Sequence, residues 1–268
     1  MTRDAHHPVV TRTTRRVTTG CLLLLTLPAA LLAYFWYSAW HSGQVNKKRE
    51  RDAVAQVVQQ AHDDADRTGK SLNGRHADET EAVDVIWQVT RAPVIQHGLS
   101  ATQFTTYITR TTTYNELGVL PAGGPVEVSR CFALTYRHTP SGWTPEDRIV
   151  DKALCEPAKR IADAVSGIRI SLEGAVGGGL TNQEMQRAFD SRVWHVRHDL
   201  RATHEDAGTT AITVNLTAED TNSGRGTTQQ CYRFDVPTPH DSTRPPEEHV
   251  TARPVPELQC AQAEPPRT

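Results

Sequence analysis

The longest apolar stretch of the chain runs from Cys21 to Trp40 and contains no charged residue. In an α-helix, about 20 residues that each rise roughly 1.5 Å cover the ~30 Å hydrocarbon core of a bilayer. Amphipathic aromatic rings favour the headgroup level of a membrane. Such rings gather at the C-terminal end of the stretch, namely Tyr34, Trp36, Tyr37 and Trp40. The pattern predicts a single transmembrane helix over residues 21–40.

A cleavable signal peptide is the alternative interpretation of this region. Basic residues precede the apolar stretch, and residues 31–33 offer a tolerable cleavage site. Cleavage there would leave a secreted protein. The apolar stretch is, however, longer than the core of an ordinary signal peptide, and bulky aromatic residues follow Ala33. These two features favour an uncleaved anchor.

The charges on either side of the stretch do not settle its orientation. Arginines precede it and a basic cluster that begins at Lys47 follows it, so the positive-inside rule finds a near tie. Of the five cysteines, all but Cys21 follow the stretch. An even number of cysteines in one domain suggests disulfides and an oxidising compartment. We therefore expect a cytoplasmic N-terminus and an extracytoplasmic C-terminal domain, which holds Cys131, Cys155, Cys231 and Cys260.

Helical periodicity continues beyond the apolar stretch. Between Lys47 and Asp66, apolar residues recur at helical spacing on one face, which predicts a juxtamembrane helix that could also form a homodimer seam. Residues 68–73 are rich in turn formers and predict a break after this helix. The polar residues 1–20 predict a disordered tail.

The rest of the chain contains two stretches of similar pattern, residues 75–160 and 180–261, and predicts an internal duplication. The first stretch opens with helical spacing that leads to a stop at Pro93. The second opens with apolar residues at helical spacing from 185 to 200. Thr181 and Glu184 have the spacing of a capping box in front of this second helix.

Each unit then continues with a β pattern in which apolar residues alternate with threonine. Residues 103–114 correspond in this way to residues 209–218. After a glycine-containing turn, residues 127–136 and 228–236 form a second matched pair of strands, and a short final segment follows. The predicted fold class is α+β, with an N-terminal transmembrane helix and two similar helix-plus-antiparallel-strand units, each with one disulfide.

The disulfide pairing depends on the repeat, because four cysteines permit three pairings. The repeat selects the local pairs Cys131–Cys155 and Cys231–Cys260. Between the units, residues 161–179 contain a glycine triplet and predict a flexible linker. The expected boundaries are 1–20 for a cytoplasmic tail, 21–40 for the anchor, 41–74 for the juxtamembrane helix and its linker, 75–160 for the first unit, 161–179 for the glycine-containing linker, 180–261 for the second unit and 262–268 for a tail.

The histidines are the first place to look for chemistry. His195 and His198 are three residues apart, so on the predicted helix they would share a face and could both reach one metal ion. No neighbouring residue completes a recognised zinc motif, and surface histidines are the favoured interpretation. The pair stays a weak candidate for a metal site, or for an envelope enzyme with a non-contiguous site.

Other motifs of catalysis and cofactor binding are missing from the sequence. It contains no nucleophile-elbow serine, no Cys-x-x-Cys and no phosphate-binding glycine loop. The net charge of −2, with both signs interspersed, gives no basis for nucleic-acid binding. The sequence predicts no catalytic residue and no cofactor.

The segment Cys231-Tyr-Arg-Phe234 with the later Cys260, set in a duplicated unit behind one anchor, resembles a group of actinobacterial membrane-anchored or secreted proteins that have no known activity. The resemblance covers roughly residues 75–261 and implies no functional residues. We therefore expect a non-enzymatic interaction or scaffolding module of the cell envelope. Its expected partners are the bilayer, through residues 21–40, and another envelope protein.

Overall fold

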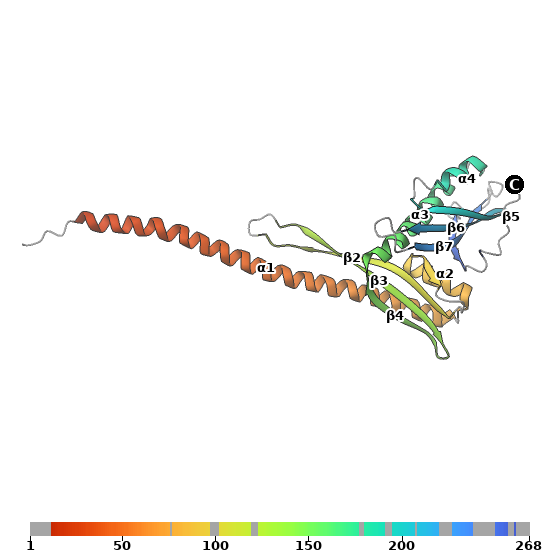
Figure 1. Cartoon of the computed structure of the whole chain (residues 1–268), viewed down its shortest axis with the longest axis horizontal. Coiled ribbons are helices and arrows are strands. Elements are labelled where there is room, and N and C mark those ends of the chain that lie inside the picture. Colours follow the sequence, from red (N-terminus) through yellow and green to blue (C-terminus); the bar gives the residue numbers. More distant parts are fainter. Residues whose placement is uncertain are drawn as a thin grey trace, which may run out of the picture. The chain divides into compact units, whose positions relative to one another are not determined.

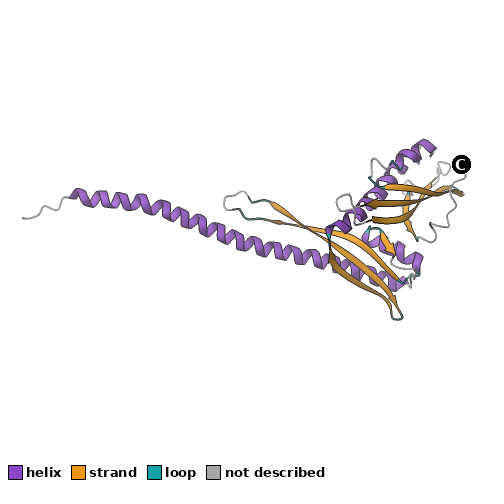
Figure 2. Ribbon diagram, viewed as in Figure 1, coloured by secondary structure: helices purple, strands orange, loops and turns teal. Residues whose placement is uncertain are grey.

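The structure is a computed structural model of the whole chain. It describes residues 12–75, 77–96, 102–118, 123–176, 180–190, 195–206, 208–219, 227–237, 250–256 and 260, with side chains from residue 26 onward except those of residues 79, 95, 96 and 206. The described chain is α+β, as predicted, and has four helices and two antiparallel four-stranded sheets (Figures 1 and 2). It divides into two compact units. The first holds residues 1–53 and 113–128, and the second holds residues 54–112 and 129–268.

Helix α1 (Arg12–Arg75) runs without interruption through the break predicted at residues 68–73 (Figure 2). The hydroxyl groups of the predicted turn bond to the helix backbone. Thr68 Oγ1 donates to the Asp64 carbonyl oxygen at 2.8 Å, and Ser71 Oγ donates to the Arg67 carbonyl oxygen at 3.0 Å. Burial of Leu72 then favours the continued helix. The predicted break is therefore wrong, and residues 12–20, expected to be disordered, are also helical.

The predicted transmembrane stretch 21–40 lies within α1. Among the residues whose side chains are described, no helix has a segment long and apolar enough to cross a membrane. The side chains of residues 12–25 lie outside the described part, so the start of the predicted stretch does too.

The first sheet follows α2 (Glu79–Thr90) and has the order β1-β2-β3-β4. Asp78 caps α2 by accepting a hydrogen bond from Glu81 N, and Arg91 ends it in the left-handed region at φ 56°. The predicted strands 103–114 and 127–136 are confirmed. The strands are β1 (Val94–Gln96), β2 (Gln103–Asn115), β3 (Pro125–Thr139) and β4 (Gly142–Val150).

Helix α3 (Lys152–Val176) occupies most of the predicted flexible linker 161–179, so that prediction is wrong. The glycine triplet that suggested a hinge comes only after the helix has ended, outside the described residues. Upstream of it, apolar residues recur every three or four positions and form one buried stripe, which stabilises a helix. The buried side chains are Cys155, Pro157, Ala158, Ile161, Ala164, Val165, Ile168 and Leu172.

The helix predicted to reach residue 200 is much shorter. The capping box of Thr181 and Glu184 is confirmed, but α4 (Asn182–Ala188) ends before the histidines, and β5 (Arg197–Asp206) follows. His195 has φ 53°, a left-handed conformation that no helix can continue through. The helical spacing of Val196 and Leu200 was thus coincidental.

The second sheet has the order β5-β6-β7-β8, the same sequential order as the first. Strands β6 (Thr209–Glu219) and β7 (Thr227–Pro237) confirm the predicted strands 209–218 and 228–236, and β8 (Thr251–Val255) completes the sheet. Strand β7 pairs antiparallel with both neighbours, with Cys231 opposite Asn215 and Val255.

Two hydrophobic cores lie within the second unit. One joins the C-terminal part of α1 to α2 and the first sheet, and the other joins α3 and α4 to the second sheet. Helix α2 serves both cores, because Ile86 belongs to the first and Trp87 to the second. The Trp87 ring meets Tyr232 edge-on, with 5.2 Å between ring centroids. Helix α2 therefore contacts the hydrophobic cores of both sheets.

Candidate functional site

The two disulfides join the cysteines as predicted. Cys131 pairs with Cys155 and Cys231 with Cys260, with Cα atoms 5.9 and 6.0 Å apart. In each case the third strand of a sheet is fastened to the segment that follows its fourth strand. Each bridge therefore ties the third strand of its sheet to the part of the chain that follows that sheet.

The predicted histidine pair does not form the expected site. His195 lies in a turn and His198 in β5, and both side chains are exposed. The His198 ring faces Phe189, with 5.9 Å between centroids. The two histidines therefore do not share a helix face. Within the described residues, no group of three or more histidine, cysteine or acidic side chains is arranged to hold a metal ion.

Large apolar side chains are exposed along one segment of α1. Trp36 is 80% exposed and Leu32 71%. Consecutive helix positions point about 100° apart, so the run from residue 31 to residue 37 covers every side of the helix. The exposed members are Leu27, Leu31, Leu32, Tyr34, Phe35, Trp36, Tyr37 and Trp40.

Residues 115–117, at the end of β2, are hydrogen-bonded to α1 just beyond this apolar segment, within the first unit. Asn46 Oδ1 accepts from Leu117 N at 2.8 Å, and Asn46 Nδ2 donates to Leu117 O at 2.9 Å. Arg49 Nη1 also donates to Asn115 O at 2.5 Å. A side-chain amide thus satisfies both backbone groups of Leu117, whose own side chain stays 41% exposed.

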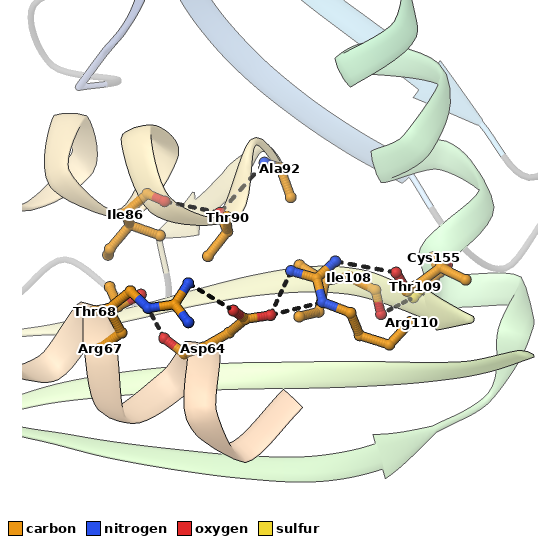
Figure 3. Close-up of polar contacts among 10 residues, drawn as sticks. All are labelled: Asp64, Arg67, Thr68, Ile86, Thr90, Ala92, Ile108, Thr109, Arg110 and Cys155. Carbon is orange, nitrogen blue, oxygen red and sulfur yellow. Dashed lines mark hydrogen bonds and ion pairs between the residues drawn. The ribbon is translucent and has the colours of Figure 1, made fainter. Parts of the chain in front are cut away.

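A polar cluster in the second unit is centred on Asp64 of α1 (Figure 3). Arg110 of β2 donates from Nε and Nη2 to the same carboxylate oxygen of Asp64, at 2.6 Å each. Arg67 approaches the other oxygen at 3.4 Å. The side chains of Asp64 and Arg110 are only 13% and 27% exposed, so this ion pair is weakly screened by solvent.

A hollow of about 180 Å³ opens beside this cluster, at the Cys131–Cys155 disulfide. Cys155 Sγ lies 3.1 Å from the Ile108 carbonyl oxygen; a disulfide sulfur carries no hydrogen, so this is a close contact and not a hydrogen bond. Arg91, Arg110 and Lys159 line the hollow, and no carboxylate lies among its described lining residues. Only Arg110 has an ion-pair partner in the described part of the chain. The hollow could accept an anionic group.

Two buried tyrosines do not titrate in the ordinary range. Burial raises the pKa of the Tyr136 hydroxyl far above its usual value, and the Thr68 hydroxyl acts in the opposite direction. Burial alone raises the pKa of Tyr232. The Tyr232 hydroxyl finds no hydrogen-bond partner in the described structure. Neither group has the character of a general acid or base at neutral pH.

Comparison of the chain with protein-family models, with curated proteins and with solved structures gives no match. The residues of the basic hollow come from three separate elements, and 46 positions separate Asp64 from Arg110. No local sequence pattern marks them, which is why sequence reasoning missed both the ion pair and the hollow.

Proposed function

We propose that this chain is a single-pass membrane protein of the cell envelope. Residues 21–40 cross the bilayer, the N-terminus is cytoplasmic and the folded part is extracytoplasmic. The observation that carries the proposal is the exposure of large apolar side chains on every side of α1 between Leu27 and Trp40. A docked protein would cover one face of such a helix, whereas lipid covers all faces at once.

Transfer of these apolar side chains from water into lipid releases a large free energy. Complete removal of one large apolar side chain from water is worth about 1.5–3 kcal/mol. The side chains of this segment are between 44% and 80% exposed. Transfer of all of them into lipid therefore contributes on the order of 10 kcal/mol. Lys47 and Lys48, both exposed, follow the segment at the position where cationic side chains meet lipid headgroups.

The orientation is supported by the two disulfides. Both lie C-terminal to the apolar segment and both fasten structural elements of the folded part. Stable structural disulfides belong to oxidising compartments. A folded part outside the cytoplasm satisfies this requirement, and the N-terminus then lies on the cytoplasmic side.

We further propose that the two halves of the folded part arose by duplication. Each half has a long helix, a short helix and a four-stranded antiparallel sheet with sequential strand order. Each has one disulfide from its third strand, closing 24 residues in the first half and 29 in the second. Agreement in both element order and cysteine position supports a common origin.

The role we propose for the folded part is non-enzymatic binding or scaffolding. The basic hollow beside Cys155 is the place best suited to a partner, because Arg91 and Lys159 bring charges that no described residue neutralises. Its chemistry fits a carboxylate or phosphate group of an envelope component. The alternative of a metal site or an enzyme at His195 and His198 rested on a helix that β5 replaces.

The anchor is tested by alkaline carbonate extraction of membranes from cells that express the full chain. We expect the protein to stay in the membrane pellet. Arginine at both Leu31 and Leu32 costs about 2.5–3.5 kcal/mol per residue at a helix centre, so the double variant should be extracted. Gln44→Arg, at an exposed position beyond the apolar segment, serves as the control and should stay in the pellet.

Extraction of the unaltered protein would contradict the anchor. If the extracted protein also began after Ala33, the alternative of a secreted protein released by signal cleavage would replace it. N-terminal sequencing of the purified protein distinguishes the two cases.

A further inference from the structure

We propose that strand β5 is a self-association surface, through which two copies of the chain join their second sheets edge to edge. The two β5 strands pair antiparallel about a two-fold axis that passes between Ala202 of one copy and Ala202 of the other. The inference goes beyond the proposed function and does not depend on the anchor, because β5 lies wholly within the second unit.

Strand β5 forms one edge of the second sheet (Figure 1). Its described ladder is the one with β6, which runs from the pair Arg197–Thr217 to the pair Asp206–Thr209. The backbone groups of an edge strand that point away from its neighbour can accept a further strand. The side chains of residues 197–199 and 203–205 are exposed along this edge. The edge is therefore long enough and open enough to pair with another strand.

A bulge divides β5 into two regular arms. Leu200 lies opposite Val214 and Ala202 opposite Thr213, so Arg201 is the extra residue. Side chains of directly opposed residues lie on the same face of a sheet. The face that carries the second hydrophobic core, with Ile212, Val214 and Leu216 of β6, therefore receives His198, Leu200, Thr203 and Glu205 of β5. The outer face receives Arg197, Asp199, Ala202 and His204.

The order of charges in β5 is complementary to itself in this antiparallel register. With Ala202 opposite its own copy, His198 lies opposite Glu205 of the second copy and Asp199 lies opposite His204. Both members of each pair lie on the same face, as pairing requires. An imidazole N–H donates to a carboxylate whether or not the ring is charged. Such opposed pairs stabilise antiparallel strands, and the two-fold axis makes each pair occur twice.

Other symmetric registers lose this match. A shift of the strands in one direction places Asp199 opposite position 206, which is also an aspartate. A shift in the other direction places Arg197 opposite His204. Like charges opposite one another destabilise a pair of strands. The charge order therefore selects the register centred on Ala202, in which Arg197 lies opposite position 206.

Two charges of this edge have partners within the chain. Arg197 contacts Glu219 of β6, and Arg201 Nη2 lies 2.8 Å from Asp199 Oδ2. These four side chains are between 41% and 73% exposed, so their ion pairs are weak and leave room for further contacts. The side chains of His204 and Glu205 have no ion-pair partner among the described residues.

The predicted homodimer seam in residues 47–66 is a less suitable surface for a second copy. Its apolar face includes Val57, Ala61 and Ala65, and all three belong to the first hydrophobic core together with residues of α2 and the first sheet. That face is therefore covered within the chain, whereas the edge of β5 is exposed.

The test is disulfide cross-linking of purified full-length protein in mild detergent. Ala202→Cys is introduced together with Cys21→Ser, and the four remaining cysteines are already paired. Opposed residues of antiparallel strands have Cα atoms about 4.5–5.5 Å apart, within reach of a disulfide. Thr213→Cys is the matched control, because Thr213 lies opposite Ala202 but one strand further from the axis. Its two copies are separated by three strand spacings, about 14 Å, which no disulfide can span.

We expect copper phenanthroline to convert the Ala202→Cys protein into a covalent dimer and to leave the Thr213→Cys protein monomeric. His204→Asp brings a carboxylate opposite Asp199 at both symmetry-related pairs and should weaken self-association about tenfold. The further change Asp199→His exchanges the two partners and should restore the dimer. His195→Asp, at an exposed position just before β5, is the control and should have no effect. Circular dichroism confirms that each variant folds.

Equal cross-linking at positions 202 and 213 would reveal unspecific collisions and overturn the inference. Cross-linking at position 202 that His204→Asp does not weaken, or that Asp199→His does not restore, would contradict the proposed register. A dimer that forms without cross-linking at position 202 would assign self-association to another surface, and a monomer would exclude it altogether. None of these outcomes bears on the anchor, which carbonate extraction tests separately.

Discussion

Arg110 of β2 directs two nitrogen atoms at one carboxylate oxygen of Asp64 on α1, each at 2.6 Å (Figure 3). This ion pair fastens the first sheet to α1. Removal of one partner leaves a charge in a site that is largely shielded from water. The remaining carboxylate then has only the longer contact with Arg67, at 3.4 Å.

Replacement of Arg110 by methionine should therefore destabilise the fold by about 2 kcal/mol, since the shape is kept and the charge is lost. Arg137→Met is the control, because Arg137 pairs with Glu146 where both side chains are 57% exposed. An exposed pair is worth about 0–1 kcal/mol. Denaturant unfolding measures both variants. Equal losses for the two would show that the shielding of Asp64 has no energetic consequence.

His62 of α1 and Asp147 of β4 form a pH-dependent contact, with His62 Nδ1 2.9 Å from Asp147 Oδ1. The hydrogen bond to Asp147 first, and the nearby charge of Asp66 next, raise the pKa of His62 above its ordinary value of 6.5. A raised pKa in the folded state means that the contact stabilises fully below pH 6.5 and is lost as pH rises through the higher folded value.

The Asp147→Asn variant should accordingly melt at a lower temperature than the unaltered protein at pH 5.5. The difference should shrink as the pH rises through the raised pKa of His62, because His62 then becomes neutral in both proteins. Thermal unfolding followed by circular dichroism across this range measures the effect. A difference in melting temperature that stays constant with pH would contradict the assignment to His62.

Gln230 of β7 connects the two sheets of the second unit. Its Oε1 accepts from Val94 N of β1 at 3.1 Å, and its Nε2 donates to Val255 O of β8 at 3.1 Å. Gln230→Ala leaves buried backbone groups without partners and should cost about 1–3 kcal/mol. The neighbouring Gln229 is exposed, so Gln229→Ala should change the free energy of unfolding by less than about 0.5 kcal/mol. A similar, small effect of both substitutions would exclude Gln230 as a structural link.

Most substitutions in a protein core lower the free energy of unfolding, but Tyr232→Phe should not. The Tyr232 hydroxyl is buried, and no partner for it is found in the described residues. Its removal relieves an unpaired polar group while the ring keeps its edge-on contact with Trp87. We expect stability to stay the same or to rise by about 1 kcal/mol. Denaturant unfolding that showed a loss above this size would reveal a hydrogen bond to the hydroxyl.

Local patterns were sufficient for the central strands and for the disulfides. Strands β2, β3, β6 and β7 alternate apolar and polar residues strongly enough to be predicted, and cysteines at matching positions of two such patterns identify their partners. The helix cap at Thr181 is equally local, because it depends on a residue only three positions away.

The wrong predictions arose where two sequence patterns pointed to different structures and the weaker one was followed. The glycine triplet after α3 predicted a flexible linker, although the residues buried between Cys155 and Leu172 stabilise a helix in front of it. Before and within β5, apolar residues happened to fall at helical spacing and predicted a helix. The left-handed conformation of His195 ends any helix there, and pairing with β6 stabilises β5 as a strand. The Asp64–Arg110 pair, the basic hollow and the link from Gln230 to Val94 join distant parts of the chain, and no single window of sequence contains them.

The most direct test of the proposed function is the accessibility of single engineered cysteines in intact cells. In the Cys21→Ser background, Thr2→Cys and Ser141→Cys are treated with a maleimide that does not cross the inner membrane, before and after permeabilisation. We expect the cysteine at position 141 to be labelled in intact cells and the cysteine at position 2 to be labelled only after permeabilisation. Labelling of position 2 in intact cells, or protection of position 141 until permeabilisation, would contradict a helix that crosses the membrane from the cytoplasm outward.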